Sequence, residues 1–548
     1  MKPISLLSAT AVFTIAGSAL AAPPAHAANP SGEACPHIYE KGILALDFQP
    51  AFLHVDRYDG PEGPADGLTI SSFYNVASNT TGVPNFFERD LVARIENVGE
   101  LDYANFDPSI DVEQLTDLTV PPFMAQTVWP NDVVRAPDGM LPFEALVVPQ
   151  GFHPAQAPGR LSIINLDDPM RGEFIVHQST QDTSLPPHSP GNEPRFYHKA
   201  LFIDMNGDGL LDIVTVRSGF RIVTFPPPPV VYPPFSELVW FENPGTALDP
   251  QVEWSEHVLS GPSPLGPDIS LDAYDFEGDG VPEIVATHFF TGDSANPPTK
   301  GKISIYGAPV GGSWADVNPA AWQFARQADI SDDRGFPFEI ELVDLNLDGK
   351  VDVLATNHQP DACTPYPTHP GQVYALEQPA DGDIFGGSWA SHTLMDDIRP
   401  QPSLPPVNPP GRLAPGRAHA FAPIAGQAGD AKPHIVVGGD EAGKVWILEP
   451  SSPEDASNWN YESAVIFDIN DFYGPGTTQS APQGVSVSTI GAPAVRHDGA
   501  HANGFAEIYV PVFEARDIHV FTYRPQGPAA RVSCVADDVL ACVAPSQP

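Results

Sequence analysis

Short runs of alternating apolar and polar residues, rich in Val, Ile, Phe and Tyr, follow one another along most of the chain. Alternation with a period of two is typical of strands that bury one face, and the Gly, Pro, Asn and Asp clusters between the runs indicate tight turns. We find no helical period of any useful length. The pattern therefore predicts an all-β chain made of many antiparallel strands.

One stretch of this pattern occurs three times, as "LFIDMNGDGLLDIVTV" (201–216), "LDAYDFEGDGVPEIVAT" (271–287) and "IELVDLNLDGKVDVLAT" (340–356). The first loop aspartates fall at similar intervals, at 204, 275 and 344. Weaker copies without the full polar loop place Glu144, His434 and Glu507 where the first copy has Asp212, and a poorer copy covers 66–75. Recurrence at a fixed interval is the signature of a repeat architecture, and it predicts seven units.

Four-stranded antiparallel units that repeat in this way close into a ring, which leaves only short and protected sheet edges. We therefore expect a seven-bladed β-propeller, with six or eight blades as alternatives because the first unit is weak. The proline-rich segments, drawn from 64 Pro in all, fall inside units and are expected to be long loops. The predicted organisation is a signal peptide (1–27), a lead-in (28–43), one propeller domain (44–525) and a C-terminal tail (526–548).

Charge and the N-terminus restrict the function further. Asp and Glu number 69 against 26 Lys and Arg, and a formal charge of −43 disfavours nucleic acid and anionic membranes as partners. Lys2, an apolar run over 4–22 and the motif Ala25-His26-Ala27 form a secretory signal, cleaved after Ala27 or, as the alternative, after Ala21. We expect a secreted protein without a membrane anchor, because no later segment is long enough to span a bilayer.

Four cysteines agree with an oxidising compartment. Cys534 and Cys542 are expected to form a disulfide in the tail, with Cys35 and Cys363 as the other pair, but four cysteines allow three connectivities. The sequon that begins at Asn79 predicts a surface glycan if the host glycosylates.

The three polar loops place oxygen atoms at alternate positions, as a hard cation requires. Each loop offers four side chains and one backbone carbonyl, and Gly207 and Gly209 permit a tight path in the first. Ca²⁺ takes six to eight oxygens and is favoured over Mg²⁺, which needs stricter octahedral geometry. An EF-hand is excluded because no Glu stands at the twelfth position and the flanks are strands. The alternative is an Asx-rich turn without metal. The candidate calcium ligands are Asp204, Asn206, Asp208, Leu210 (carbonyl) and Asp212; Asp275, Glu277, Asp279, Val281 (carbonyl) and Glu283; and Asp344, Asn346, Asp348, Lys350 (carbonyl) and Asp352.

The segments "DMNGDGLLDIV", "DFEGDGVPEIV" and "DLNLDGKVDVL" resemble the calcium loops of FG-GAP/VCBS repeats, as found in integrin α-subunit propellers. The resemblance implies that each loop joins the innermost strand of a blade to the next one and holds Ca²⁺ for structure. Glu277 and Glu283 depart from the usual Asp/Asn pattern. A weaker resemblance, carried by "GFPFEIELVDLNLDGKVDVLATNHQP" and "LVWFENPG", is to the propeller of fungal aldos-2-ulose dehydratases. It implies a metal-assisted site, although we do not expect the cupin part of that family in this chain.

Histidines recur just before the first strand of a unit and just after the second, at the end opposite the polar loop. These positions are expected to meet at one mouth of the central channel, where imidazole and carboxylate groups would act as acid and base or bind a transition metal such as Zn²⁺. The alternative is that each His only hydrogen-bonds a loop. The predicted catalytic residues are His198, Arg217, His288, Glu339, His358 and His419, with Arg217 or Lys199 placed to neutralise an enolate.

No HExxH, G-x-S-x-G or Walker motif indicates a hydrolase or NTPase. Together these features favour a lyase- or isomerase-type enzyme that acts on a sugar-like or other small oxygenated substrate. A carbohydrate-binding lectin and an adhesion or scaffold propeller without catalysis are the alternatives, and a cyclase for a small natural product is a further one. A lectin should repeat its pocket residues from blade to blade, whereas the variable loops here differ, which favours one unique site.

Overall fold

The computed structural model describes residues 37–60, 63–72, 90–116, 127, 129–151, 159–168, 170–178, 195–223, 230–249, 252–259, 266–289, 301–317, 326–331, 334–360, 371–401, 413–424, 426–473, 489–496 and 504–523. All structural statements below concern these residues. The signal peptide, the four cysteines, the tail and the sequon at Asn79 lie outside them, so those predictions stay predictions.

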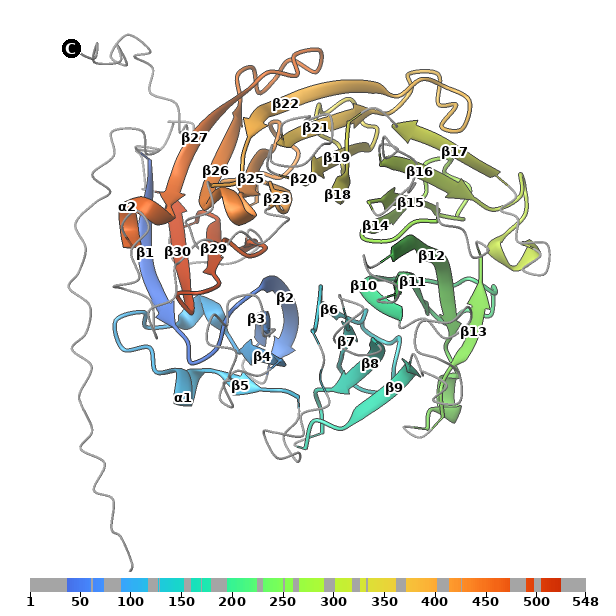
Figure 1. The fold of residues 1–548 in the computed structure, drawn as a ribbon, viewed down its shortest axis with the longest axis horizontal. Helices are drawn as coiled ribbons and strands as arrows, with labels where there is room; N and C mark the ends of the chain where they lie inside the picture. Colours follow the sequence, from blue (N-terminus) through green and yellow to red (C-terminus); the bar gives the residue numbers. More distant parts are fainter. Residues whose placement is uncertain are drawn as a thin grey trace, which may run out of the picture.

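Seven four-stranded antiparallel sheets stand around a central channel like the blades of a propeller (Figure 1). This confirms the predicted seven-bladed β-propeller. From the channel outward, the first three blades are β2 (Phe52–Gly60), β3 (Gly63–Ser72), β4 (Leu91–Ile95) and β5 (Glu113–Gln114); β6 (Val134–Arg135), β7 (Ala145–Pro149), β8 (Arg160–Asn165) and β9 (Glu173–Gln178); and β10 (Arg195–Ile203), β11 (Asp212–Val223), β12 (Val230–Glu242) and β13 (Ser255–Val258).

The next three blades follow in chain order around the ring. They are β14 (Leu271–Tyr274), β15 (Glu283–His288), β16 (Lys302–Gly307) and β17 (Arg326–Ser331); β18 (Pro337–Val343), β19 (Asp352–Asn357), β21 (Gly371–Glu377) and β22 (Ala390–Ile398); and β24 (Ala418–Phe421), β25 (His434–Gly438), β26 (Lys444–Pro450) and β27 (Tyr461–Asp468). The short strands β20 (Gln359–Pro360) and β23 (Leu413–Ala414) pair with each other, and the two α-helices are single turns, α1 (Pro108–Asp111) and α2 (Ile469–Tyr473).

The seventh blade joins the two ends of the propeller. Its inner strands β28 (Ala494–Arg496), β29 (Glu507–Val512) and β30 (Asp517–Tyr523) come from the end of the chain, and its outermost strand β1 (Ile38–Ala45) comes from the beginning. An ion pair from Lys41 to Glu507 and a hydrogen bond between Glu40 and Nδ1 of His519 fasten β1 to its blade. The lead-in predicted over 28–43 is therefore wrong in its boundary, because β1 is already part of the propeller.

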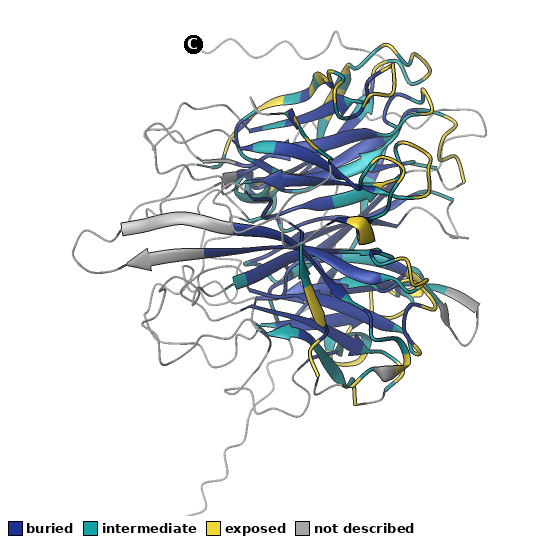
Figure 2. Ribbon diagram, turned by 90° about the vertical axis from the view of Figure 1, so that its right-hand side faces the viewer, coloured by how far each residue is buried: buried dark blue, intermediate teal, exposed yellow. Residues whose placement is uncertain are grey.

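Apolar residues of the middle strands fill the space between neighbouring blades. Val147 and Ile163 of one blade lie in the same buried cluster as Val239 and Phe241 of the next. Burial of such side chains is the main favourable term in folding, and it explains why the strands read as alternating patterns. Buried residues run through the strands and exposed ones gather in the connections (Figure 2). Within the part of the chain that the structure describes, no helix has the length and apolar character needed to cross a membrane.

Candidate functional site

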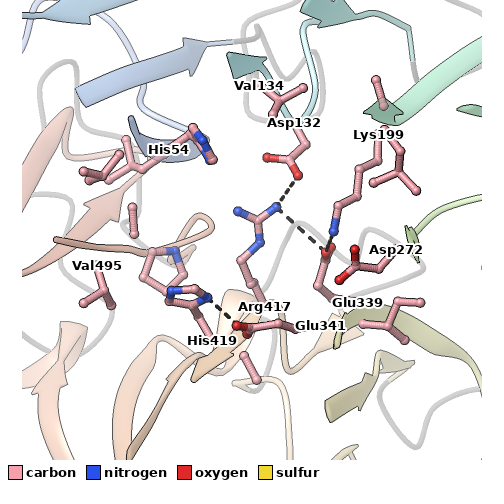
Figure 3. Close-up of a pocket in the computed structure, with 18 residues that line it drawn as sticks. His54, Asp132, Val134, Lys199, Asp272, Glu339, Glu341, Arg417, His419 and Val495 are labelled. Atoms are coloured by element: carbon pink, nitrogen blue, oxygen red, sulfur yellow. Dashed lines mark hydrogen bonds and ion pairs between the residues drawn. The ribbon is translucent and has the colours of Figure 1, made fainter. Parts of the chain in front are cut away.

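A cavity of about 380 Å³ lies in the central channel, and every blade contributes to its wall (Figure 3). The lining comes from the innermost strands or from the residues directly before them, which is why segments far apart in sequence meet there. The polar lining residues are His54, Asp132, Lys199, Asp272, Glu339, Glu341, Arg417 and His419. The site is thus built from four carboxylates, two permanently charged cations and two imidazoles.

Two β-bulges place charged residues in this wall. The register between β10 and β11 shifts between Tyr197 and Ala200, and that between β18 and β19 shifts between Pro337 and Ile340. A bulge adds one residue to a strand and re-aims the side chains around it. The shifts fall at Lys199 and Glu339, which both line the cavity.

A chain of ion pairs crosses the channel. The Arg417 guanidinium lies 2.7 Å from Oδ2 of Asp132 and 4.0 Å from Oε1 of Glu339. The same Glu339 oxygen accepts a hydrogen bond from Lys199 Nζ at 2.8 Å and one from Ser270 Oγ at 3.1 Å. Four blades are therefore connected through their charges, and Glu339 stands at the centre of the network.

These contacts keep the network charged at neutral pH. Burial alone would raise the pKa of Asp132, but the positive charges of Arg417 and Lys199 outweigh it and hold that pKa at about 2. Burial would lower the pKa of Lys199, yet the carboxylates of Glu339 and Asp132 raise it above its usual value. The lysine stays an ammonium and Asp132 stays a carboxylate.

His419 and Glu341 form a histidine–carboxylate pair on the cavity wall. Nδ1 of His419 lies 3.1 Å from Oε2 of Glu341, which also accepts the backbone N–H of Ala420 at 2.9 Å. Burial would raise the pKa of Glu341, but the charge and hydrogen bond of His419 lower it below its usual value. A carboxylate that accepts the Nδ1 proton leaves the lone pair on Nε2, the arrangement that a general base needs.

Two further groups face the cavity with pKa values shifted by burial. Burial lowers the pKa of the His54 imidazole below 6.5, and the nearby Asp132 only partly opposes this shift. Burial raises the pKa of Asp272, and the positive charge of Lys199 only partly opposes this shift. The two oxygens of Asp272 accept the backbone N–H groups of Ala273 and Leu342 at 2.8 and 3.0 Å. Because burial favours its protonated form, Asp272 is a wall residue suited to act as a general acid.

Aromatic rings pack beside the charged network. The imidazole of His198 contacts the rings of Phe52 and Phe338 edge-on, at centroid distances of 5.7 and 6.1 Å. His358 stacks on Phe338 at 4.4 Å and its Nδ1 lies 2.7 Å from the Pro415 carbonyl. Burial lowers the pKa of both histidines to about 4, so they are neutral at pH 7.

The predicted catalytic residues divide into three groups. Glu339 and His419 line the cavity, and His198 and His358 belong to the aromatic layer beside it. Arg217 and His288 lie on the second strands β11 and β15 and are absent from the cavity wall.

The contacts of Arg217 and His288 hold their blades together. Nε of Arg217 donates to Glu237 at 2.6 Å, and its two other nitrogens donate to Glu256 at 2.6 and 2.9 Å. Nε2 of His288 lies 2.8 Å from the Tyr306 hydroxyl. The structure thus brings together only part of the predicted set.

The sequence pattern missed His54, Asp272, Glu341 and Arg417 as candidates. All but Arg417 stand within innermost strands, in "AFLHVDRY", "LDAYDF" and "EIELVDL". In the three units with polar loops, the cavity side chains stand three or five residues before the first loop aspartate, as in Asp272 and Asp275. A polar residue three or five residues before the first loop aspartate, in an otherwise apolar strand, could therefore have predicted a side chain in the cavity wall.

The three polar loops share one pattern of hydrogen bonds, which supports the donor set that the resemblance implies. The first aspartate accepts the backbone N–H four and five residues on, as Asp204 does from Asp208 and Gly209. The same two bonds are made by Asp275 and by Asp344. Oxygens held in this way are pre-arranged, and their carboxylate, amide and carbonyl chemistry suits Ca²⁺.

The last of the four donor side chains in each loop is buried and holds the loop from within. Asp212, Glu283 and Asp352 each accept the backbone N–H of the second loop residue, at 2.9 to 3.1 Å. Among the residues that the structure describes, no three His, Cys, Asp or Glu side chains are grouped to hold one metal ion. Calcium at the loops and a transition metal at the channel mouth therefore stay predictions.

No family model and no curated protein matches the sequence. Among solved structures, the chain is similar to Chaetomium thermophilum Raptor, at 9% identity over 89% of this chain and 29% of that one, with a TM-score of 0.39. It is also similar to α-L-arabinanase from Cellvibrio cellulosa in complex with arabinohexaose, at 11% identity over 63% of this chain and 98% of that one, with a TM-score of 0.29. A third similar structure is the exotype rhamnogalacturonan lyase YesX, at 12% identity over 88% of this chain and 76% of that one, with a TM-score of 0.37. This chain spans less than a third of Raptor. All three TM-scores lie below 0.5, so these likenesses carry no argument about function.

Proposed function

We propose that this propeller is an enzyme that binds one small, sugar-like molecule in its channel and removes a proton next to a carbonyl group, as lyases and isomerases do. The observation that carries the proposal is the His419–Glu341 pair on the wall of the cavity. A base oriented by a carboxylate and set opposite cationic groups is the arrangement that enolate chemistry needs.

The roles follow from the position of each group. His419 takes the proton from carbon through Nε2, and Glu341 stabilises the imidazolium that forms. Lys199 and Arg417 supply positive charge for the oxygen of the developing enolate. Asp272, with its raised pKa, is the group suited to protonate a leaving hydroxyl in an elimination. In an isomerisation it would protonate the carbonyl oxygen and take the proton of the neighbouring hydroxyl, while His419 returns its proton to the neighbouring carbon.

The charge of the wall restricts the substrate. Four carboxylates face two permanent cations, and each cation is already paired with a carboxylate. A strongly anionic ligand would be repelled, whereas the hydroxyl groups of a neutral sugar would find donors and acceptors all around. The cavity volume of about 380 Å³ suits a monosaccharide-sized molecule rather than a long chain.

Binding without turnover is the second candidate function. It is favoured by the pairing of Lys199 with Glu339 and of Arg417 with Asp132, since paired charges are less available to a transition state. In that case the channel would serve as a single lectin site.

The experiment is a screen of neutral keto- and aldos-2-ulose sugars for elimination or isomerisation products, repeated with His419→Asn. The matched control is His392→Asn. That residue forms a similar pair, with Nε2 2.8 Å from Glu377, but lies on the outer strand β22. Loss of turnover in His419→Asn alone supports the enzyme. Binding without any product in the wild type favours the lectin, and no binding at all rejects the channel as a sugar site.

Secretion and calcium complete the proposal. The signal-like N-terminus supports export, and the shared loop geometry supports Ca²⁺ as a structural ion that would tie the first two strands of a blade together. Asp204, Asn206, Asp208 and the Leu210 carbonyl would hold it in the first loop. In the third loop, the corresponding donors are Asp344, Asn346, Asp348 and the Lys350 carbonyl.

A further inference from the structure

The middle polar loop differs from the other two by an arginine. Nη1 of Arg326, on β17, donates to both carboxylate oxygens of Glu277 at 2.7 and 2.6 Å. Nη2 of the same guanidinium lies 3.3 Å from Oε1 of Glu283. Two of the five donors expected to bind calcium in this loop are therefore already in contact with a cation.

The guanidinium is held firmly in this position. Its Nε donates to the Ala308 carbonyl at 2.7 Å, and its central carbon lies 4.4 Å from the centroid of the Phe385 ring. The Arg326 side chain is only 15% exposed. A guanidinium with a hydrogen bond, a ring contact and two carboxylate contacts is an ordered part of the fold rather than a passing surface contact.

The other two loops lack this device at the equivalent position. Arg326 pairs with Gly307, the last residue of the third strand, whereas the corresponding pairs are Ser255 with Glu242 and Ala390 with Glu377. At the last position of the third strand, the blade with Arg326 has a glycine and the two neighbouring blades have a glutamate. At the paired position of the fourth strand, those two blades have a small residue in place of the arginine.

Glycine at 307 is what leaves room for the arginine. A Cβ at this position would lie 2.6 Å from the Phe385 ring and 3.0 Å from Nη2 of Arg326. The two differences between the blades thus belong together.

The carboxylate that forms the last donor of each loop shows the same substitution of partners. Asp212 and Asp352 each accept a second backbone N–H, from Asn243 at 2.8 Å and from Gln378 at 3.1 Å. In the middle blade, the corresponding second contact of Glu283 is with the guanidinium. The arginine therefore replaces a main-chain hydrogen-bond donor to Glu283, in addition to its contact with Glu277.

We infer that the Arg326 guanidinium takes the place of the metal ion in loop 275–283, so that this loop folds without a divalent cation. The positive charge would repel a calcium ion bound nearby, and both oxygens of Glu277 are engaged. The inference concerns only the middle loop. The expectation that loops 204–212 and 344–352 bind Ca²⁺ is a separate part of the proposed function.

Calorimetric titration with CaCl₂ tests this directly. The double variant Asp204→Asn/Asp344→Asn removes the first carboxylate of loops 204–212 and 344–352, and in this variant we expect no calcium binding. Adding Arg326→Ser should free the carboxylates of the middle loop and create one calcium site. The control in the same background is Arg334→Ser, whose guanidinium contacts Gln372 and Thr393 instead, and it should gain none.

Either of two results would overturn the inference: one calcium bound by the double variant while Arg326 is present, or no gain after Arg326→Ser. If the double variant does not fold, Arg326→Ser in the wild-type background must raise the calcium stoichiometry by one, judged on protein with native circular dichroism. A wild type that binds no calcium, combined with a gain in Arg326→Ser, would reject the calcium sites at loops 204–212 and 344–352 and leave the inference standing.

Discussion

Nζ of Lys199 lies 2.8 Å from Oε1 of Glu339, although their strands, β10 and β18, belong to blades separated by a third blade. Each residue stands at a β-bulge of its own innermost strand. The pair spans the channel and holds the wall of the cavity in place. Removing one charge from such a buried pair costs more than the pair itself contributes, because the other charge stays buried.

Replacement of Glu339 should therefore be strongly destabilising. Glu339→Gln leaves Lys199 and Arg417 without the carboxylate they share and should lower the free energy of unfolding by about 3 kcal/mol. Urea denaturation measures this change. The control is Asp329→Asn, which breaks an equally short pair with Lys302 at a site 44% exposed and should cost less than about 1 kcal/mol. Similar losses in the two variants would mean that the channel network contributes nothing special.

Arg217 should prove structural rather than catalytic. Arg217→Gln removes the partner of the buried Glu237 and of Glu256 and should cost about 3 kcal/mol of stability. Arg217→Lys keeps the charge but cannot make all three hydrogen bonds, so it should cost less. Both folded variants should keep the substrate turnover of the wild type. A large fall in kcat for folded Arg217→Lys would return Arg217 to the catalytic set.

The buried histidines His198, His358 and His434 should each take stability from the propeller as the pH falls below about 6.5. The folded-state pKa values of His198, His358 and His434 are lowered by burial to about 4, while the unfolded values stay near 6.5. Between these limits each of these histidines binds more protons in the unfolded chain, so its contribution to stability falls as the pH drops and levels off below about 4. Urea midpoints at pH 7, 6 and 5 measure the slope. His358→Phe, which keeps a ring against Phe338, should lose less stability between pH 7 and pH 5 than the wild type does, and identical slopes in the two proteins would contradict the contribution of His358.

Chelation should lower the midpoint of thermal unfolding if loops 204–212 and 344–352 hold calcium. Excess EGTA removes an ion that binds only the folded state. The stability lost depends on the free calcium concentration before chelation relative to the Kd of the site. The midpoint of Asp204→Asn/Asp344→Asn should be insensitive to EGTA, whereas Asp275→Asn should keep the full sensitivity of the wild type. An EGTA effect that persists in the double variant would place the ion elsewhere.

The fold was accessible from the sequence because its signal is local and repeated. The polar loops that begin at Asp204, Asp275 and Asp344 mark the first turn of three blades, and the period-two strands around Glu144, His434 and Glu507 mark others. The part played by β1 was not accessible, because its partner β30 lies at the other end of the chain.

The site was only partly accessible, for physical reasons that particular residues show. Glu339 and His419 were found because they stand at strand starts. Arg217 was misplaced, because it lies in the middle of the second strand β11, which continues to Val223, and its side chain contacts Glu237 and Glu256 of its own blade. The contact between Glu277 and Arg326 joins a residue of the loop between β14 and β15 to a residue of β17, and no spacing in the sequence predicts it.

Exchange of a carbon-bound proton with solvent tests the central claim most directly. Proton NMR of a neutral keto sugar in D₂O would follow loss of the signal next to the carbonyl in the presence of the protein. We predict exchange with the wild type and with His392→Asn, and its loss with His419→Asn and Glu341→Gln of native fold. Equal exchange in all four proteins, or none with the wild type while the sugar binds in the channel, would contradict the proposal that His419 is a catalytic base.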